Sequence, residues 1–260
     1  MLNYSFDLNN LEYFLCILVR ITMFVFIAPF FSQSGVPRQY KVGLSIFLSG
    51  LMYGVIGEHP DLQYMTVFGY AVIVLKEALT GLIIGYSTSI CTTIVDFAGR
   101  IIDMETGLSM VNLMDPATRQ QSSVSGIIYQ YGVMLMLFLS GMHRYLLQAL
   151  AETFTLIPVN GAVINTDKLL SSSISFMGDY IAIGFRICLP VFGVMLLLNA
   201  VLGIMAKVAP QMNMFSVGMQ IKVLVGLCIL FFTIGMLPSV SNLIYSEMKT
   251  MMASFVSTML

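Results

Sequence analysis

Five charged side chains lie inside runs of apolar residues: Arg20, Lys76, Glu77, Arg186 and Lys222. A charge at membrane depth is costly and usually faces protein or a water-filled path, so these positions are candidates for ion pairing or proton transfer. Lys76 and Glu77 are adjacent, hence about 100° apart around a helix, and they cannot pair side by side. No series of titrating groups connects the five charges into a relay. We therefore expect their partners elsewhere, on other subunits, rather than along a proton path.

A second group of charges, Asp96, Arg100 and Asp103, is spaced by four and then three residues. This spacing places all three on one face of a helix, where the arginine could meet both carboxylates. Two interpretations follow from this pattern. The group could be a polar stripe that lines a path, or a structural cluster whose charges neutralise one another locally. The second interpretation needs no further assumption, and we favour it.

The residue patterns that support enzymatic or metal chemistry are missing from the sequence. Four cysteines stand singly in apolar runs: Cys16, Cys91, Cys188 and Cys228. They form no CxxC pair, and neither His59 nor His143 belongs to an HExxH motif. A GxxxxGK[ST] phosphate-binding motif is also missing, so energy for any transport would come from outside this chain. We expect no catalytic activity, no cofactor and no metal site.

The composition defines the environment in which these charges must be placed. Of 260 residues, 58% are hydrophobic and only 10% are charged, and the mean hydropathy is +0.89. Soluble domains carry about 25% charged residues, so this chain cannot cover a water-facing surface. The composition is that of an integral membrane protein. A net charge of −1 gives no basic footprint, and nucleic acid is not expected as a partner.

The apolar runs predict an all-α protein of irregular helical hairpins. A helix that crosses a bilayer needs about 20 mostly apolar residues. Six segments approach or exceed this length: 11–31, 42–56, 64–95, 125–139, 181–206 and 215–237. The second and fourth are short for a span, and the third is long and interrupted by glycines. The N-terminal stretch lacks the basic region and cleavage site of a signal peptide, so we expect it to be retained.

Residues 107–121, GLSMVNLMDPATRQQ, interrupt the apolar runs in the middle of the chain. Gly107 can end the preceding helix in the left-handed conformation, and Asp115-Pro116 can begin another, with Asp as N-cap and Pro at the first helical position. The connector between them could be a lid, a plug or a simple turn. Its methionines could seal against irregular neighbours, although composition alone favours their role as ordinary apolar mass.

Three segments carry a resemblance to a known family. Residues 20–44 contain an Arg, an Ala-Pro, a second Pro and Lys-Val-Gly-Leu; residues 98–116 contain Ala-Gly, Gly-Leu-Ser and Asp-Pro elements. Residues 189–226, with Leu-Pro, Asn, Leu-Gly, Ala-Pro-Gln-Met-Asn and Phe-x-x-Gly in order, are the most specific match. Together these segments resemble the flagellar biosynthetic protein FliR family, over residues 11–248. No single motif carries the resemblance, which rests on the ordered set.

The resemblance implies an export-gate subunit of a type III secretion system in the bacterial inner membrane, at the flagellar basal body. It implies one membrane domain over 1–260, with a FliP-like part (1–180) followed by a FliQ-like helical hairpin (181–260). The implied partners are FliP, FliQ and FlhB, and unfolded flagellar proteins would pass through the channel. The central loop of the family plugs the closed pore. That role carries over here to Gly107, Leu108, Ser109, Met110, Val111, Asn112, Leu113, Met114, Asp115 and Pro116.

Some residues depart from the family pattern, and other functions compete with this one. Relatives commonly carry an uncharged or acidic residue at the position of Arg100, and Gly and Gln around Asp103 and Glu105. The charged stripe is therefore interpreted as a local replacement for another contact. An injectisome export-gate homologue is one alternative function. A secondary transporter is another, but it predicts matching halves, and the Ala-Pro-Gln-Met-Asn hairpin has no second copy.

Overall fold

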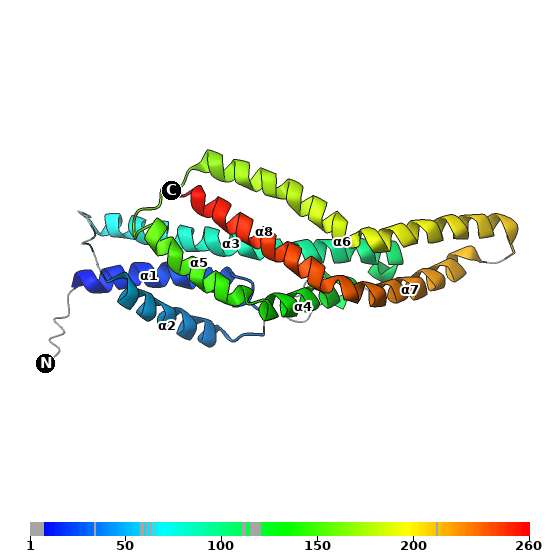
Figure 1. The fold of residues 1–260 in the computed structure, drawn as a ribbon, viewed down its shortest axis with the longest axis horizontal. Coiled ribbons are helices and arrows are strands. Elements are labelled where there is room, and N and C mark those ends of the chain that lie inside the picture. The colour runs from blue at the N-terminus through cyan, green and yellow to red at the C-terminus, as the bar shows by residue number, and fades with distance from the viewer. Residues whose placement is uncertain are drawn as a thin grey trace. The chain divides into compact units, whose positions relative to one another are not determined.

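The computed structural model describes residues 8–33, 35–57, 60, 62, 64, 66–110, 113–114, 121–211 and 213–260. Eight α-helices account for most of them (Figure 1): α1 Leu8–Ile27, α2 Arg38–Ile56, α3 Val67–Thr106, α4 Val124–Leu139, α5 Met142–Leu156, α6 Thr166–Val208, α7 Met214–Thr233 and α8 Leu237–Ser257. The short elements are two 3-10 turns, η1 Leu108–Met110 and η2 Ile234–Met236, and two strands, β1 Leu113–Met114 and β2 Gln121–Ser122. The predicted all-α membrane fold is confirmed.

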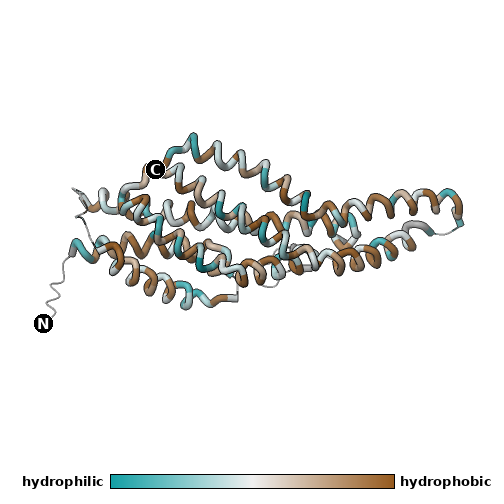
Figure 2. The backbone as a smooth tube through the Cα atoms, viewed as in Figure 1, coloured by the Kyte–Doolittle hydropathy of each residue, from teal (hydrophilic) through white to brown (hydrophobic). Residues whose placement is uncertain are grey.

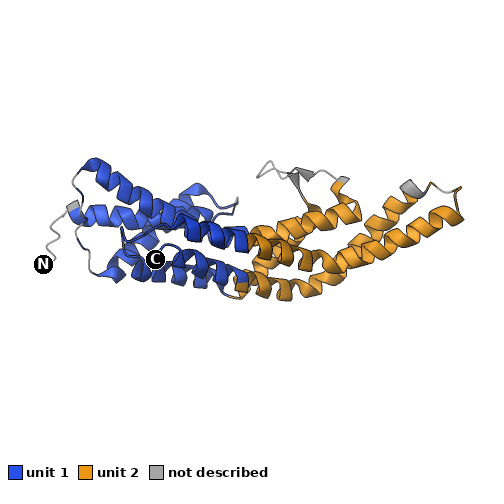
Figure 3. Ribbon diagram, turned by 90° about the horizontal axis from the view of Figure 1, so that it is seen from above, with its two compact units in different colours: residues 1–90, 141–175, 247–260 blue, residues 91–140, 176–246 orange. Residues whose placement is uncertain are grey.

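The chain forms two compact units (Figure 3). Unit 1 contains Met1–Ile90, Gly141–Ser175 and Glu247–Leu260, and unit 2 contains Cys91–Ser140 and Phe176–Ser246. Three helices, α3, α6 and α8, contribute residues to both units. The sequence-based division between residues 180 and 181 falls inside α6, which continues through that point without a break.

In unit 1, α3 packs directly on α1 because glycine removes the side chain between them. A Cβ added at Gly81 would collide with the backbone carbonyl of Arg20, and one added at Gly85 would lie 3.2 Å from the Phe24 carbonyl oxygen. The α5 face that carries Leu146 and Leu150 is buried, as its four-residue spacing requires. The last residues of the chain join the same unit, since the Val163 amide donates to the Met259 carbonyl at 3.1 Å.

In unit 2, α6 and α7 run alongside one another and are joined by residues 209–213 (Figures 1 and 3). A Cβ added at Gly218 would lie 3.5 Å from Leu202 on α6, within van der Waals contact. The end of α3 packs on α7, where a Cβ at Gly226 would come within 2.6 Å of the Thr106 methyl carbon. The two helices therefore form a hairpin that also supports the end of α3.

Four helical stretches of the described residues are long and apolar enough to cross a membrane: Asn9–Ile27, Val67–Thr106, Thr166–Val208 and Ser216–Ser257. Counting α4 and α5 together as one span would make five. Apolar residues extend along these helices in Figure 2. Of the six apolar runs in the sequence, 42–56 is short for a span, and α2, which contains it, does not qualify. Its hydropathy is lowered by the strongly polar residues of its first turn, Arg38, Gln39 and Lys41.

Candidate functional site

The connection between α3 and α4 begins with a glycine stop. α3 ends at Thr106, and Gly107 adopts φ of +82°, a left-handed conformation in which other residues are strained. This confirms the helix end predicted from the sequence. Leu108, in the η1 turn that follows, is buried, whereas Ser109 is exposed. The α-helix therefore stops at Gly107 and continues as a 3-10 turn.

The connection then folds back on itself in unit 2. β1 pairs antiparallel with β2, with Leu113 opposite Ser122 and Met114 opposite Gln121. The sequence did not predict this pairing, because two-residue strands carry too little pattern to be recognised. The other predicted plug residues Val111, Asn112, Asp115 and Pro116 lie outside the described residues, as do the side chains of Met110, Leu113 and Met114.

The N-terminus of α4 is held by two side chains. The Ser123 hydroxyl oxygen accepts a hydrogen bond from the Gly126 amide at 2.7 Å, which makes Ser123 the N-cap. Asp103 on α3 accepts from the Ser125 amide at 3.2 Å, and only 3% of Asp103 is exposed. A carboxylate at this end also complements the partial positive charge of the helix N-terminus. Asp103 thus fastens the first turn of α4 to the last turns of α3.

Two glycines allow this close crossing of α3 and α4. A Cβ added at Gly99 would collide with the backbone of Gly126, and a Cβ at Gly126 would lie 2.6 Å from the Ser123 hydroxyl oxygen. Helix backbones can approach this closely only where neither residue has a side chain. We refer to Gly99, Asp103, Ser123, Ser125 and Gly126 as the α3–α4 clasp. It fixes the α4 end of the connection against α3.

Arg100 and Asp96 form an ion pair of 2.9 Å along the surface of α3, with 55% and 28% of their side chains exposed. Exposed pairs of this kind contribute about 0.3–0.5 kcal/mol. Helical spacing would allow Arg100 to meet both carboxylates, but among the described residues it pairs with Asp96 only. Asp103 is instead buried beneath α4, where its carboxylate oxygen accepts a hydrogen bond from the Ser125 amide. The three charges therefore form no single cluster: Asp96 and Arg100 pair on the surface, and Asp103 belongs to the clasp.

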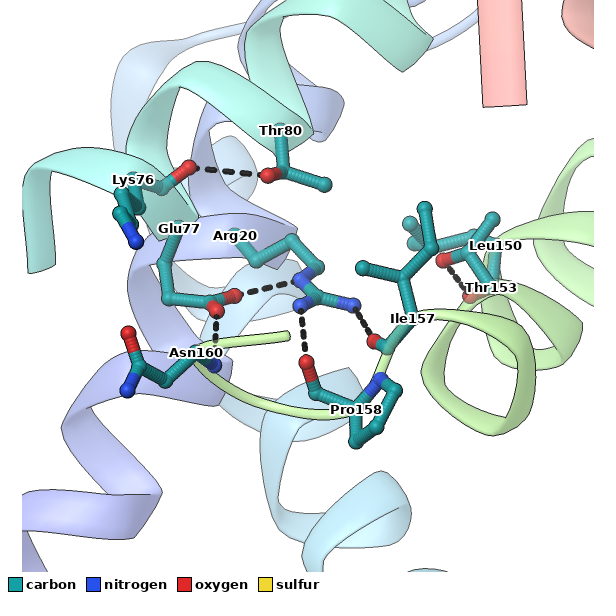
Figure 4. A network of polar contacts seen from close by, with 9 residues as sticks. All are labelled: Arg20, Lys76, Glu77, Thr80, Leu150, Thr153, Ile157, Pro158 and Asn160. Atoms are coloured by element: carbon teal, nitrogen blue, oxygen red, sulfur yellow. Dashed lines mark hydrogen bonds and ion pairs between the residues drawn. The ribbon is translucent and has the colours of Figure 1, made fainter. Parts of the chain in front are cut away.

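A second polar arrangement lies inside unit 1 (Figure 4). Arg20 Nε on α1 lies 2.5 Å from Glu77 Oε2 on α3, and neither side chain is exposed to solvent. The arginine also donates to the backbone carbonyls of Ile157 at 2.8 Å and Pro158 at 3.5 Å. Glu77 uses its other oxygen to accept from the Asn160 amide at 2.8 Å. Both charges are therefore satisfied by hydrogen bonds as well as by each other.

This network ties three distant segments together: α1, α3 and the connection that follows α5. The guanidinium also lies over the Phe154 ring, 4.4 Å from its centre, which adds a cation–π contact. Asn160 sits in the left-handed region with φ of +68°, held there while its amide is bonded to Glu77. For Arg20 and Glu77, the partner is in the same chain and not, as the sequence alone suggested, on another subunit.

The three remaining charges behave differently. Lys76 and Lys222 are half-buried, and Arg186 is exposed on α6. None of the three forms an ion pair with any residue in the described part of the chain. Figure 4 shows Glu77 directed toward Arg20, with no interaction drawn between Glu77 and Lys76. Their expected pairing with other subunits stays a prediction.

Comparison of the sequence with known proteins identifies the family to which the chain is similar. Residues 11–248 match the model of the bacterial export proteins, family 1. The flagellar biosynthetic protein FliR of Bacillus subtilis (strain 168) is 33% identical over 221 residues, which cover 84% of each chain. The proteins of the same name from Escherichia coli (strain K12) and Aquifex aeolicus (strain VF5) are 25% and 29% identical. Their matches cover 92% and 84% of this chain, and 91% and 83% of the relatives. The matched range includes both the clasp and the buried ion pair.

Proposed function

This chain belongs to the bacterial export proteins of family 1, and on that premise we propose that it is a structural subunit of the flagellar type III export gate. It assembles with FliP and FliQ, with FlhB associated, into a channel through which unfolded flagellar proteins leave the cell. Its place is the bacterial inner membrane, at the base of the flagellum. The likeness to flagellar relatives over most of their length carries this proposal and favours flagellar use over an injectisome.

The surface of the chain supports a role inside a larger membrane assembly. Apolar side chains such as Phe231 and Phe232 on α7 are 73% and 77% exposed, and Arg186 presents a charge on an apolar helix. Lipid could cover the first kind of residue, but it disfavours the second. A subunit surrounded by other subunits accommodates both.

Residues 107–121 are the proposed plug of the closed channel. Three features of the described residues support this role. The segment begins at a left-handed glycine, β1 within it pairs with β2 at its far end, and the clasp holds its junction with α4. Contacts at both ends of the segment would hold α3 and α4 in place while the segment between them changes position.

The chain is proposed to combine a FliP-like part, residues 1–180, with a FliQ-like hairpin, residues 181–260. The α6–α7 hairpin supports this proposal, because two long apolar helices joined by a short connection would suffice for a small membrane subunit. Since α6 continues through residue 181, the division describes likeness to two subunits and not a break in the chain.

Complementation of a strain that lacks this gene tests the proposed function. We expect the intact gene to restore flagellin in the culture medium, and the complex isolated from that strain to contain FliP and FliQ. A strain that secretes flagellin normally without the gene would contradict the proposal. The accumulation or depletion of a small solute in that strain would instead favour a secondary transporter.

A further inference from the structure

Two arginines that lie in apolar helices, Arg20 and Arg186, differ in burial and in ion pairing. Arg20 is fully buried and paired with Glu77. Arg186 is exposed near the middle of the 43-residue helix α6, and no carboxylate in the described residues pairs with it. Its charge is therefore uncompensated within the described chain.

The neighbours of Arg186 are unsuited to water. Phe185 and Leu189 are 48% and 61% exposed on the same helix, and α6 contains a stretch with a mean hydropathy of 2.4. Lipid would accept these two side chains but not the guanidinium beside them. A water-filled space would accept the guanidinium but not the apolar side chains. Protein that supplies both apolar contact and a negative charge satisfies all three.

We propose that the face of α6 around Arg186 docks an apolar helix of another subunit, and that this helix presents an aspartate or glutamate to Arg186. This inference rests on the proposed function and names the chemistry of the partner. Guanidinium groups pair with carboxylates through two parallel hydrogen bonds, and this is the favoured form of an arginine ion pair away from water. Charge complementarity carries the proposal.

The backbone of α6 leaves room for such an approach. Gly193 lies two turns beyond Arg186, and a Cβ added there would meet nothing within 4 Å in the described chain. Glycine in a helix interior is destabilising, and here no internal contact explains it. Small residues at membrane helix interfaces let two backbones come close together. The glycine indicates a close approach, and the arginine indicates the charge of the partner.

A photo-crosslinking amino acid at Leu189, one turn from Arg186, identifies the occupant in the otherwise unmodified complex. We expect a crosslink to a helix of another gate subunit, at a peptide that contains an acidic residue. Crosslinks to lipid only would overturn the proposal and would assign the counter-charge to a lipid phosphate. This measurement does not depend on a variant that must fold.

Charge variants then test the pairing itself in the complete complex. Arg186→Lys should retain most of the co-purified partner, whereas Arg186→Glu should lower the partner recovered per copy of this chain by about tenfold or more. Replacing the crosslinked acidic residue by lysine should restore recovery with Arg186→Glu. Arg100→Glu is the matched control, because Arg100 is also exposed in unit 2 but pairs with Asp96 in the same chain.

The outcomes separate this inference from the proposed function. An unmodified chain that recovers no gate subunit would refute the proposed function. If the unmodified chain recovers its partners, and Arg186→Glu recovers them equally well, the Arg186 inference is wrong and the proposed function stands.

Discussion

Arg20 and Glu77 are 57 positions apart in the sequence, yet their side chains meet at 2.5 Å inside unit 1, with neither exposed. Two opposite charges on two apolar helices neutralise each other, and the arginine continues to the backbone carbonyls of Ile157 and Pro158. The pair therefore also positions the connection that leads from α5 to α6. Arg20, which the sequence suggested would pair with another subunit, instead connects α1, α3 and the segment after α5 within this chain.

Removing one member of this pair should be far more harmful than removing both. Arg20→Leu and Glu77→Leu each leave a buried charge without its partner, which costs about 3–5 kcal/mol. The double variant leaves no net charge and should recover much of that loss. Thermal unfolding and the yield of folded protein in detergent measure the relative stability of the single and double variants. Lys76→Leu, beside Glu77 but without an ion pair in the described chain, is the control and should behave like the unmodified protein.

The crossing of α3 and α4 should not tolerate a methyl group. Gly99→Ala would place its Cβ into the backbone of Gly126, so the helices must separate and the clasp must open. We expect a drop in the unfolding temperature of the purified chain. Gly203→Ala is the matched control in α6, where a Cβ meets nothing within 4 Å and alanine favours the helix by about 0.5–1 kcal/mol. Equal unfolding temperatures for the two variants would show that the close crossing is not required.

Asp103 should stabilise the protein through the hydrogen bond that its oxygen accepts from the Ser125 amide, and not through an interaction with Arg100. Asp103→Asn keeps an acceptor for the Ser125 amide, whereas Asp103→Leu leaves that buried amide unpaired, at about 1–3 kcal/mol. The leucine variant should unfold at a lower temperature than the asparagine variant. Asp96→Leu, which breaks only the partly exposed pair with Arg100, should change stability by less than about 1 kcal/mol. Similar losses for Asp96→Leu and Asp103→Leu would favour the stripe.

Deleting residues 108–114 tests the plug. The helices on either side are held by contacts outside the deletion, at Thr106 with Gly226 and at Asp103 with Ser125. The complex should therefore still assemble, but its closed state should leak ions. Membrane conductance of cells or of reconstituted complexes measures the leak. Unchanged conductance in a complex of normal composition would remove the plug assignment.

The sequence predicted helices well where the apolar pattern was dense. The run 125–139 corresponds to α4, Val124–Leu139, within one residue. The run 181–206 captured only part of α6, which begins at Thr166, because the serine-rich start of that helix lacks apolar density. A signal was present there: Asn165 accepts from the Lys168 amide at 3.1 Å, as an N-cap residue should.

The candidate sites depend on relationships that helical spacing does not contain. Spacing placed Asp103 on one face with Asp96 and Arg100. It could not show that α4 crosses α3 there and that its Ser125 amide donates to the Asp103 carboxylate. In the same way, the apolar runs showed that Arg20 and Glu77 needed partners. Only the packing of α3 on α1, which Gly81 permits, brought them together.

Native mass spectrometry of the detergent-extracted chain, expressed alone and together with FliP and FliQ, shows whether this chain is a subunit of the export gate. We expect co-expression to yield one copy of this chain within a larger mixed complex. A stable monomer or homodimer that excludes both partners would refute the gate-subunit role and direct attention to the transport of small solutes.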